Sequence, residues 1–139
     1  MRDVFLDTIL PGDAALGLPP GSTMDMAGYA ARHGTGSRMA ELLDLLGRTS
    51  REEFGAPFET LDADRRLACV ERAKRKSSRL ATTVIVDCLK AYYTDAKILE
   101  KLSAGSVPPF PTGNVLEDDD WTLLEPVYER GPIYRPVSS

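Results

Sequence analysis

The chain has 139 residues and a net charge of −4, and its apolar and charged fractions, 42% and 27%, are those of an ordinary globular protein. This length predicts a single domain that buries roughly 70% of the surface exposed by the unfolded chain. The negative charge gives no reason to expect nucleic-acid binding. No apolar run approaches the roughly 18 residues that a membrane-spanning helix needs.

The start of the chain and the two cysteines bear on its compartment. Residues 1–7 have neither the basic start and apolar core of a secretion signal nor a pair of arginines. As the sequence stands, a cytoplasmic location is expected, and a periplasmic one if a leader was removed or a partner carries one. Cys69 and Cys88 fall within helical apolar patterns, which favours two buried thiols over a disulfide.

The first half of the chain reads as short helices separated by glycine and proline, which end helices and make turns. Met39, Leu42, Leu43 and Leu46 follow the i, i+3, i+4, i+7 spacing of a helix with one apolar face. Short polar residues stand where helices would begin, and their side chains can accept hydrogen bonds from free N–H groups. The helices expected here are Asp3–Leu10, one from Thr23 or Asp25 to Arg32, and one from Ser37 to about Gly47, followed by a separate turn at 50–53.

Two longer helices are expected next, then a short one. Asp62 is the predicted N-cap of the first, and Leu67, Val70 and Ala73 form its narrow inner face. The second begins at Ser77 or Ser78; its length and 3.6-residue period favour a helix over a strand, although β-branched residues are frequent at 82–86. Asp87 falls on the outer side of this helix. Its predicted inner face is Leu80, Ala81, Val84, Ile85, Cys88, Leu89 and Tyr92, and a last helix, Ala96–Leu102, follows a cap at Asp95.

After Leu102 the composition changes. Six of the ten prolines and the only tryptophan lie beyond this point, together with apolar residues that a disordered tail rarely keeps. The sequence therefore predicts an all-α protein: a small helical bundle, residues 1–102, and a long, non-helical, proline-rich arm, residues 103–139. The arm is expected to cover this bundle and also contact a partner, to cover the bundle alone, or to be disordered. Its candidate partner-binding residues are Pro108, Pro109, Phe110, Pro111, Gly113, Asn114, Trp121, Leu124, Pro126, Val127 and Tyr134.

Residues able to do catalytic chemistry are sparse. His33 has no cysteine or carboxylate cluster around it in the sequence, so it is a poor metal ligand and is better explained as a helix-end residue. Gly34-Thr35-Gly36 is followed by no Lys-Ser/Thr pair, which favours a turn between helices over a phosphate loop. The acidic run 117–120 lacks the spacing of a calcium loop. The basic run 72–79 is either a solvated helix end or a docking surface for an acidic partner.

Several segments together resemble one protein family. The motifs are Phe5-Leu6-Asp7-Thr8-Ile9-Leu10-Pro11-Gly12-Asp13 with Gly17-Leu18-Pro19, Phe54-Gly55-Ala56-Pro57-Phe58 with Leu61-Asp62 and Arg66, Tyr92-Tyr93-Thr94-Asp95, Pro108-Pro109-Phe110-Pro111, and Leu123-Leu124-Glu125-Pro126-Val127. On these motifs the chain resembles the gluconate 2-dehydrogenase subunit 3 family, the small subunits of flavin-dependent sugar and alcohol dehydrogenases. The resemblance covers most of the chain.

The resemblance implies a non-catalytic subunit that carries no cofactor. In such complexes a large subunit of the glucose-methanol-choline oxidoreductase type holds FAD and oxidises the substrate, and a multihaem cytochrome c subunit often takes the electrons. The small subunit supports folding, flavin loading and stability of the large one. Two other functions stay open: a free adaptor or ligand-binding bundle, and a stand-alone enzyme that uses His33.

Overall fold

The computed structural model describes residues 1–102 and 121–131, which belong to two different units of the chain and are described separately. The predicted all-α class is confirmed, because the described residues contain seven α-helices and no β-strand. None of these helices is long and apolar enough to cross a membrane. The helices are α1 (Arg2–Ile9), α2 (Met26–His33), α3 (Gly36–Phe54), α4 (Ala63–Lys76), α5 (Ser78–Tyr93), α6 (Ala96–Lys101) and α7 (Glu125–Arg130).

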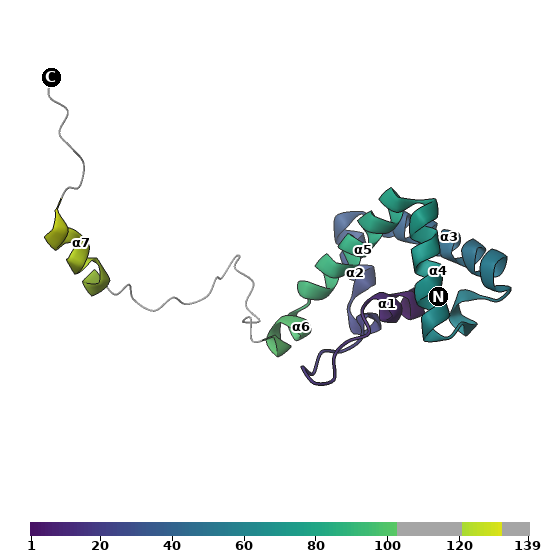
Figure 1. Cartoon of the computed structure of the whole chain (residues 1–139), viewed down its shortest axis with the longest axis horizontal. Helices are drawn as coiled ribbons and strands as arrows, with labels where there is room; N and C mark the ends of the chain where they lie inside the picture. Colours follow the sequence, from purple (N-terminus) through teal and green to yellow (C-terminus); the bar gives the residue numbers. More distant parts are fainter. Residues whose placement is uncertain (103–120, 132–139) are drawn as a thin grey trace, which may run out of the picture. The chain divides into compact units, whose positions relative to one another are not determined.

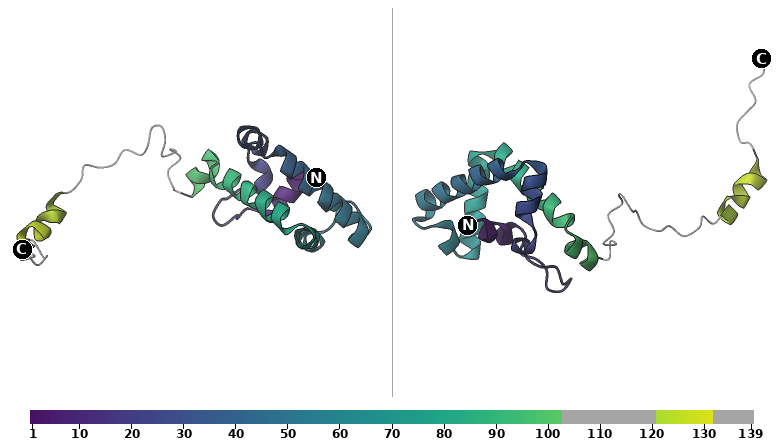
Figure 2. Two further views of the ribbon diagram at one scale, coloured as in Figure 1. Left: turned by 90° about the horizontal axis from the view of Figure 1, so that it is seen from above. Right: turned by 180° about the vertical axis from the view of Figure 1, so that it is seen from behind.

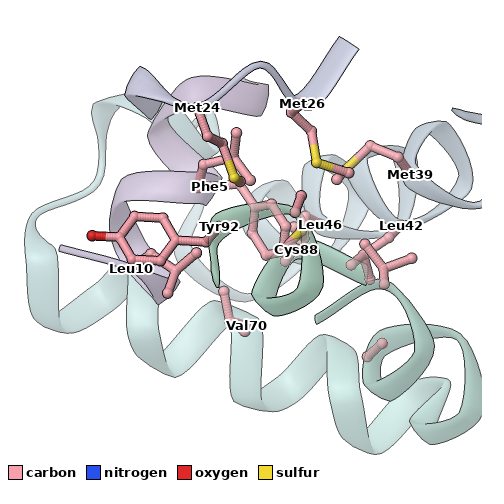
Figure 3. Close-up of a cluster of buried hydrophobic side chains, with 14 of the residues drawn as sticks. Phe5, Leu10, Met24, Met26, Met39, Leu42, Leu46, Val70, Cys88 and Tyr92 are labelled. Carbon is pink, nitrogen blue, oxygen red and sulfur yellow. The ribbon is translucent and has the colours of Figure 1, made fainter. Parts of the chain in front are cut away.

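The first six helices form the bundle. In the views of Figures 1 and 2, α3, α4 and α5 lie side by side. Helix α1 packs against α4, and α2 packs against α3 and α5. Figure 3 shows the core between these helices, with Phe5 from α1 placed beside side chains of α3, α4 and α5. Three methionines, Met24, Met26 and Met39, lie along one edge of this cluster; their unbranched side chains suit irregular gaps.

The expected aspartate caps are confirmed at three helix starts. The side chains of Asp25, Asp62 and Asp95 accept hydrogen bonds from backbone N–H groups in the first turns of α2, α4 and α6, at 2.8, 2.8 and 2.9 Å. Each bond satisfies a donor that the helix itself leaves free. The short-range pattern in the sequence was therefore sufficient to locate these starts.

The predicted end of α3 near Gly47 is wrong, and so is its start at Ser37. The helix begins at Gly36 behind Thr35 and continues to Phe54, so the expected separate turn at 50–53 is part of it. One interior glycine costs a helix about 1 kcal/mol, which packing readily outweighs. Ser50 is buried in this extension and donates a 2.6 Å hydrogen bond to the Ala56 carbonyl, which holds the following turn against the helix. The helix ends where Gly55 adopts a positive φ of 68°.

The predicted inner faces of α4 and α5 are each partly wrong. Leu67 is 53% exposed, whereas Cys69, Val70 and Ala73 are buried, so the buried face of α4 is rotated away from the predicted one. On α5, Leu89 is exposed and Asp87 is buried. Asp87 turns inward because its carboxylate accepts a 3.0 Å hydrogen bond from Arg38 of α3, and this ion pair compensates much of its desolvation.

The prediction of a wholly non-helical arm is also wrong for residues 121–130. A 3-10 turn, Trp121–Leu124, leads directly into α7. Pro126 does not prevent this helix because it stands in the first turn, where its missing N–H would have no partner within the helix. An acidic residue at the first turn and a basic one at the last suit the helix dipole, and Gly131 ends the segment at φ 67°.

Candidate functional site

Only part of the predicted partner-binding arm is described by the structure. Trp121 and Leu124 belong to the 3-10 turn, and Pro126 and Val127 belong to α7. The other predicted contact residues lie outside the described residues, as does the acidic run 117–120: Pro108, Pro109, Phe110, Pro111, Gly113, Asn114 and Tyr134.

The segment Trp121–Arg130, called here the α7 segment, exposes its large apolar side chains. Trp121 is 67% exposed and Tyr128 is 71% exposed, while Leu124 and Val127 are exposed to a lesser degree. No residue of α7 is buried. Leu124, Val127 and Tyr128 follow an i, i+3, i+4 spacing that places them on one face of the helix. Taken by itself, the α7 segment is thus a short amphipathic helix with an exposed apolar face.

Tyr128 was not among the predicted partner-binding residues, although four residues of the same segment were. In an extended, proline-rich arm, which the sequence was taken to predict, Tyr128 has no special position. Once 125–130 is helical, Tyr128 joins Leu124 on the apolar face. The helical signal was present as Glu125 before Pro126 and Gly131 after Arg130.

His33 occupies the end of α2, as expected. Its ring packs against that of Tyr29 one turn earlier, with the two ring centroids 4.3 Å apart. A histidine at this end of a helix also suits the helix dipole.

Residues 1–102 and 121–131 contain no group of three His, Cys, Asp or Glu side chains that could hold a metal ion. Gly34, at φ 63°, ends α2 and is followed after one residue by α3, as expected of a turn between helices.

Both cysteines are free and buried, which confirms the expectation of two thiols. Cys69 donates a weak hydrogen bond, 3.7 Å long, from Sγ to the Leu46 carbonyl. Burial raises the pKa of both thiols, and the pKa of Cys88 reaches about 12, with the neighbouring Asp87 carboxylate adding to the shift. Because the thiolate is the reactive form, both side chains serve as small apolar core residues.

The shifted thiol gives a testable pH dependence. The unfolded Cys88 thiol ionises near 9.0 and the folded one near 12, so its contribution to stability is complete below pH 9 and is lost as the pH rises through this window. Ionisation of the Cys88 thiol in the unfolded chain is expected to lower the wild-type free energy of unfolding in this window by up to about 1.4 kcal/mol per pH unit. Urea unfolding of wild type and Cys88→Ala at about pH 8 and about pH 10 checks it. The stability difference between the two proteins should narrow at the higher pH; a constant difference would contradict the buried thiol.

A hollow of about 300 Å³ lies between the loop after α1 and the end of α5. Tyr92 closes one side of it, and its hydroxyl donates a 2.6 Å hydrogen bond to the Pro19 carbonyl, 73 residues away in sequence. In Figure 3 this hydroxyl points away from the other labelled core side chains. Apolar residues line most of the hollow, with Asp13 as its one charged residue. The Asp13 side chain accepts hydrogen bonds from the Ala15 and Leu16 N–H groups, so it shapes the loop.

Comparison with known proteins gave no match of any kind. No family model matches the chain, no curated protein is similar to it, and no solved structure is similar to it.

Proposed function

We propose that this chain is a non-catalytic small subunit that binds, stabilises and aids maturation of an FAD-dependent sugar, alcohol or glycoside dehydrogenase of the glucose-methanol-choline type. The observation that carries the proposal is the exposed apolar face of the α7 segment, in which Trp121 and Tyr128 are the most exposed large apolar side chains. The motif resemblance, which includes part of this same segment, supplies the kind of partner.

A six-residue helix with no buried residue has little to stabilise it in water. Isolated helices shorter than about 12 to 15 residues are marginal even when every residue favours the helix. An amphipathic helix of this kind is stabilised when its apolar face lies in a groove of another protein, which is a recurrent mode of recognition. Trp and Tyr dominate the energy of such contacts. The α7 segment is therefore suited to be a docking element that becomes fully stable on the partner.

The proposed division of labour places FAD and the oxidation chemistry in the partner. This chain would then contribute surface: the bundle is a compact unit with one core cluster, and the α7 segment would extend the contact onto the flavin subunit. A complex of this kind is expected to bury well over about 2,000 Å², as obligate complexes do. A cytochrome c subunit is a further candidate member of the assembly.

The test is purification of the full chain, tagged at its N-terminus, from its natural source. We expect a flavin-bearing protein of several hundred residues to accompany it, with the absorbance of oxidised flavin, and to be lost when the chain is cut after Leu102. The bundle purified alone should show neither flavin nor haem absorbance. Recovery of the chain without any flavin-bearing protein would contradict the proposal and favour a free adaptor.

His33 provides the control for catalysis by this chain. If the stand-alone enzyme were correct, His33→Ala would abolish the activity of the purified complex. We expect this variant to keep full activity, since the imidazole lies against Tyr29 at the end of α2.

A further inference from the structure

The junction of α4 and α5 carries a concentration of positive charge. Residues 72–79 include five cations and no acidic residue, in a chain whose net charge is −4. This cluster is called here the basic corner: Arg72, Lys74, Arg75, Lys76 and Arg79. Three of its members stand at the end of α4, where the helix dipole favours them, but Arg79 stands in the first turn of α5, where the dipole disfavours a cation. Helix stability alone therefore does not account for the corner.

The corner is only partly neutralised by its neighbours. Arg72 pairs with Glu53, and Lys76 pairs with Glu52 at 2.7 Å. Within the part of the chain that the structure describes, no ion pair is formed by Lys74, Arg75 or Arg79. Within residues 1–102 and 121–131, three exposed cations thus have no ion-pair partner, which concentrates positive potential at this corner of the bundle.

The surface beside Arg75 is hollowed and has an apolar part, and Arg79 lines a separate hollow together with Arg38 and Glu41. A hollow of about 450 Å³ runs along α4 and includes Leu67, Ala68 and Arg75 in its lining. A second hollow, of about 360 Å³, has Arg75 and Lys76 in its lining. Arg75 belongs to both, so the two hollows adjoin. Leu67, which was expected to be buried, supplies an exposed apolar contact about one and a half helical turns before Arg72, the first cation of the corner.

We infer that this face, from Leu67 to Arg79, is a second docking surface of the proposed complex and takes an acidic segment of the flavin subunit. The inference rests on the proposed function. Carboxylates of the partner would pair with the guanidinium groups of Arg75 and Arg79, which bind carboxylates through two parallel hydrogen bonds. An aliphatic side chain of the same segment would lie against Leu67. Asp64 and Glu71 also line the first hollow, so its Leu67 end suits the aliphatic side chain, and the partner's carboxylates would lie toward Arg75 and Arg79. This mixture of charges disfavours the continuous phosphate chain of a nucleic acid more than a segment with a few separate carboxylates.

The test is a charge reversal with a matched control, each made in the full chain. Arg75→Glu with Arg79→Glu removes two cations that form no ion pair, and Lys90→Glu with Lys97→Glu makes the same change of net charge on exposed residues elsewhere. We expect the reversal to weaken binding of the purified flavin subunit about tenfold or more and to reduce the salt dependence of the association rate. The control should bind as wild type does. Circular dichroism and urea unfolding verify that both variants are folded.

The outcomes separate this inference from the proposed function. If the flavin subunit binds wild type and the reversal variant equally, the inference is wrong and the proposed function stands. If no flavin subunit accompanies wild type, both are wrong. If the reversal abolishes binding to a labelled RNA oligonucleotide while flavin-subunit binding is unchanged, the basic corner serves nucleic acid and the inference is overturned. Leu67→Ser adds an independent check: we expect weaker binding with an unchanged salt dependence.

Discussion

Replacement of Phe5 by alanine is expected to lower the free energy of unfolding by about 3 to 5 kcal/mol, which is the usual range for a buried phenylalanine. Phe5 is 0% exposed and belongs to the same cluster as Leu46 and Cys88. The substitution removes the ring from a site where α1 meets the longer helices, and the surrounding helices can collapse into the gap only in part. Since a domain of this size has about 5 to 15 kcal/mol in total, the loss is a large fraction of it.

Equilibrium urea unfolding followed by circular dichroism measures this effect. The matched control is Leu16→Ala, because Leu16 is 61% exposed in the loop after α1 and should contribute less than about 0.5 kcal/mol. Equal unfolding free energies for Phe5→Ala and Leu16→Ala would mean that α1 does not belong to the core.

Replacement of Trp121 and Tyr128 together by serine is expected to abolish most of the binding to the flavin subunit while leaving the bundle unchanged. Aromatic anchors at the centre of an interface each contribute about 2 kcal/mol or more, which is about thirtyfold in affinity for one of them. Both side chains are exposed within the α7 segment, so the substitutions remove no packing within that segment. Affinity, flavin content and thermal stability of the complex should all fall.

The control for this variant lies on the opposite face of the same helix. Glu129→Gln removes a charge from the polar side of α7 and should change affinity little, because charges at the rim of an interface contribute mainly to the association rate. Unchanged binding of the double variant would show that the α7 segment is not an anchor, even if a flavin subunit still accompanies the chain.

The helical content and several helix starts could be predicted because their causes are local. An aspartate cap needs only the residue itself and the next turn of chain, so Asp62 and Asp95 were identified from their positions, and Asp25 as one of two candidates with Thr23. Likewise, the turn at residues 34–36 follows from glycine, which takes positive φ without strain.

The errors come from contacts between residues far apart in the chain. The inward position of Asp87 depends on Arg38, 49 residues away, and no periodicity within α5 contains this information. The continuation of α3 through Gly47 depends on packing of the helix as a whole. A narrow apolar stripe also does not fix which side of a helix faces the core. A small rotation of α4 about its axis is enough to bury Cys69 and expose Leu67.

The candidate site was predicted in part. Trp121, Leu124 and Val127 were chosen as anchors for their apolar side chains, and the structure leaves all three exposed in or beside α7. The helix that aligns two of them with Tyr128 was not predicted, because proline was taken as evidence against helix at a position where it is tolerated.

The distribution of the core along the chain has a consequence for biosynthesis. The continuous core includes both Phe5 and Ile98, and the hydrogen bond from Tyr92 to Pro19 joins the two ends of the bundle. A nascent chain that ends before Ile98 does not contain the whole core. Helix α1 therefore cannot complete its packing until α5 and α6 have left the ribosome. Vectorial synthesis therefore delivers the α7 segment only after the residues needed to complete the bundle, which places the proposed docking element last in the order of emergence.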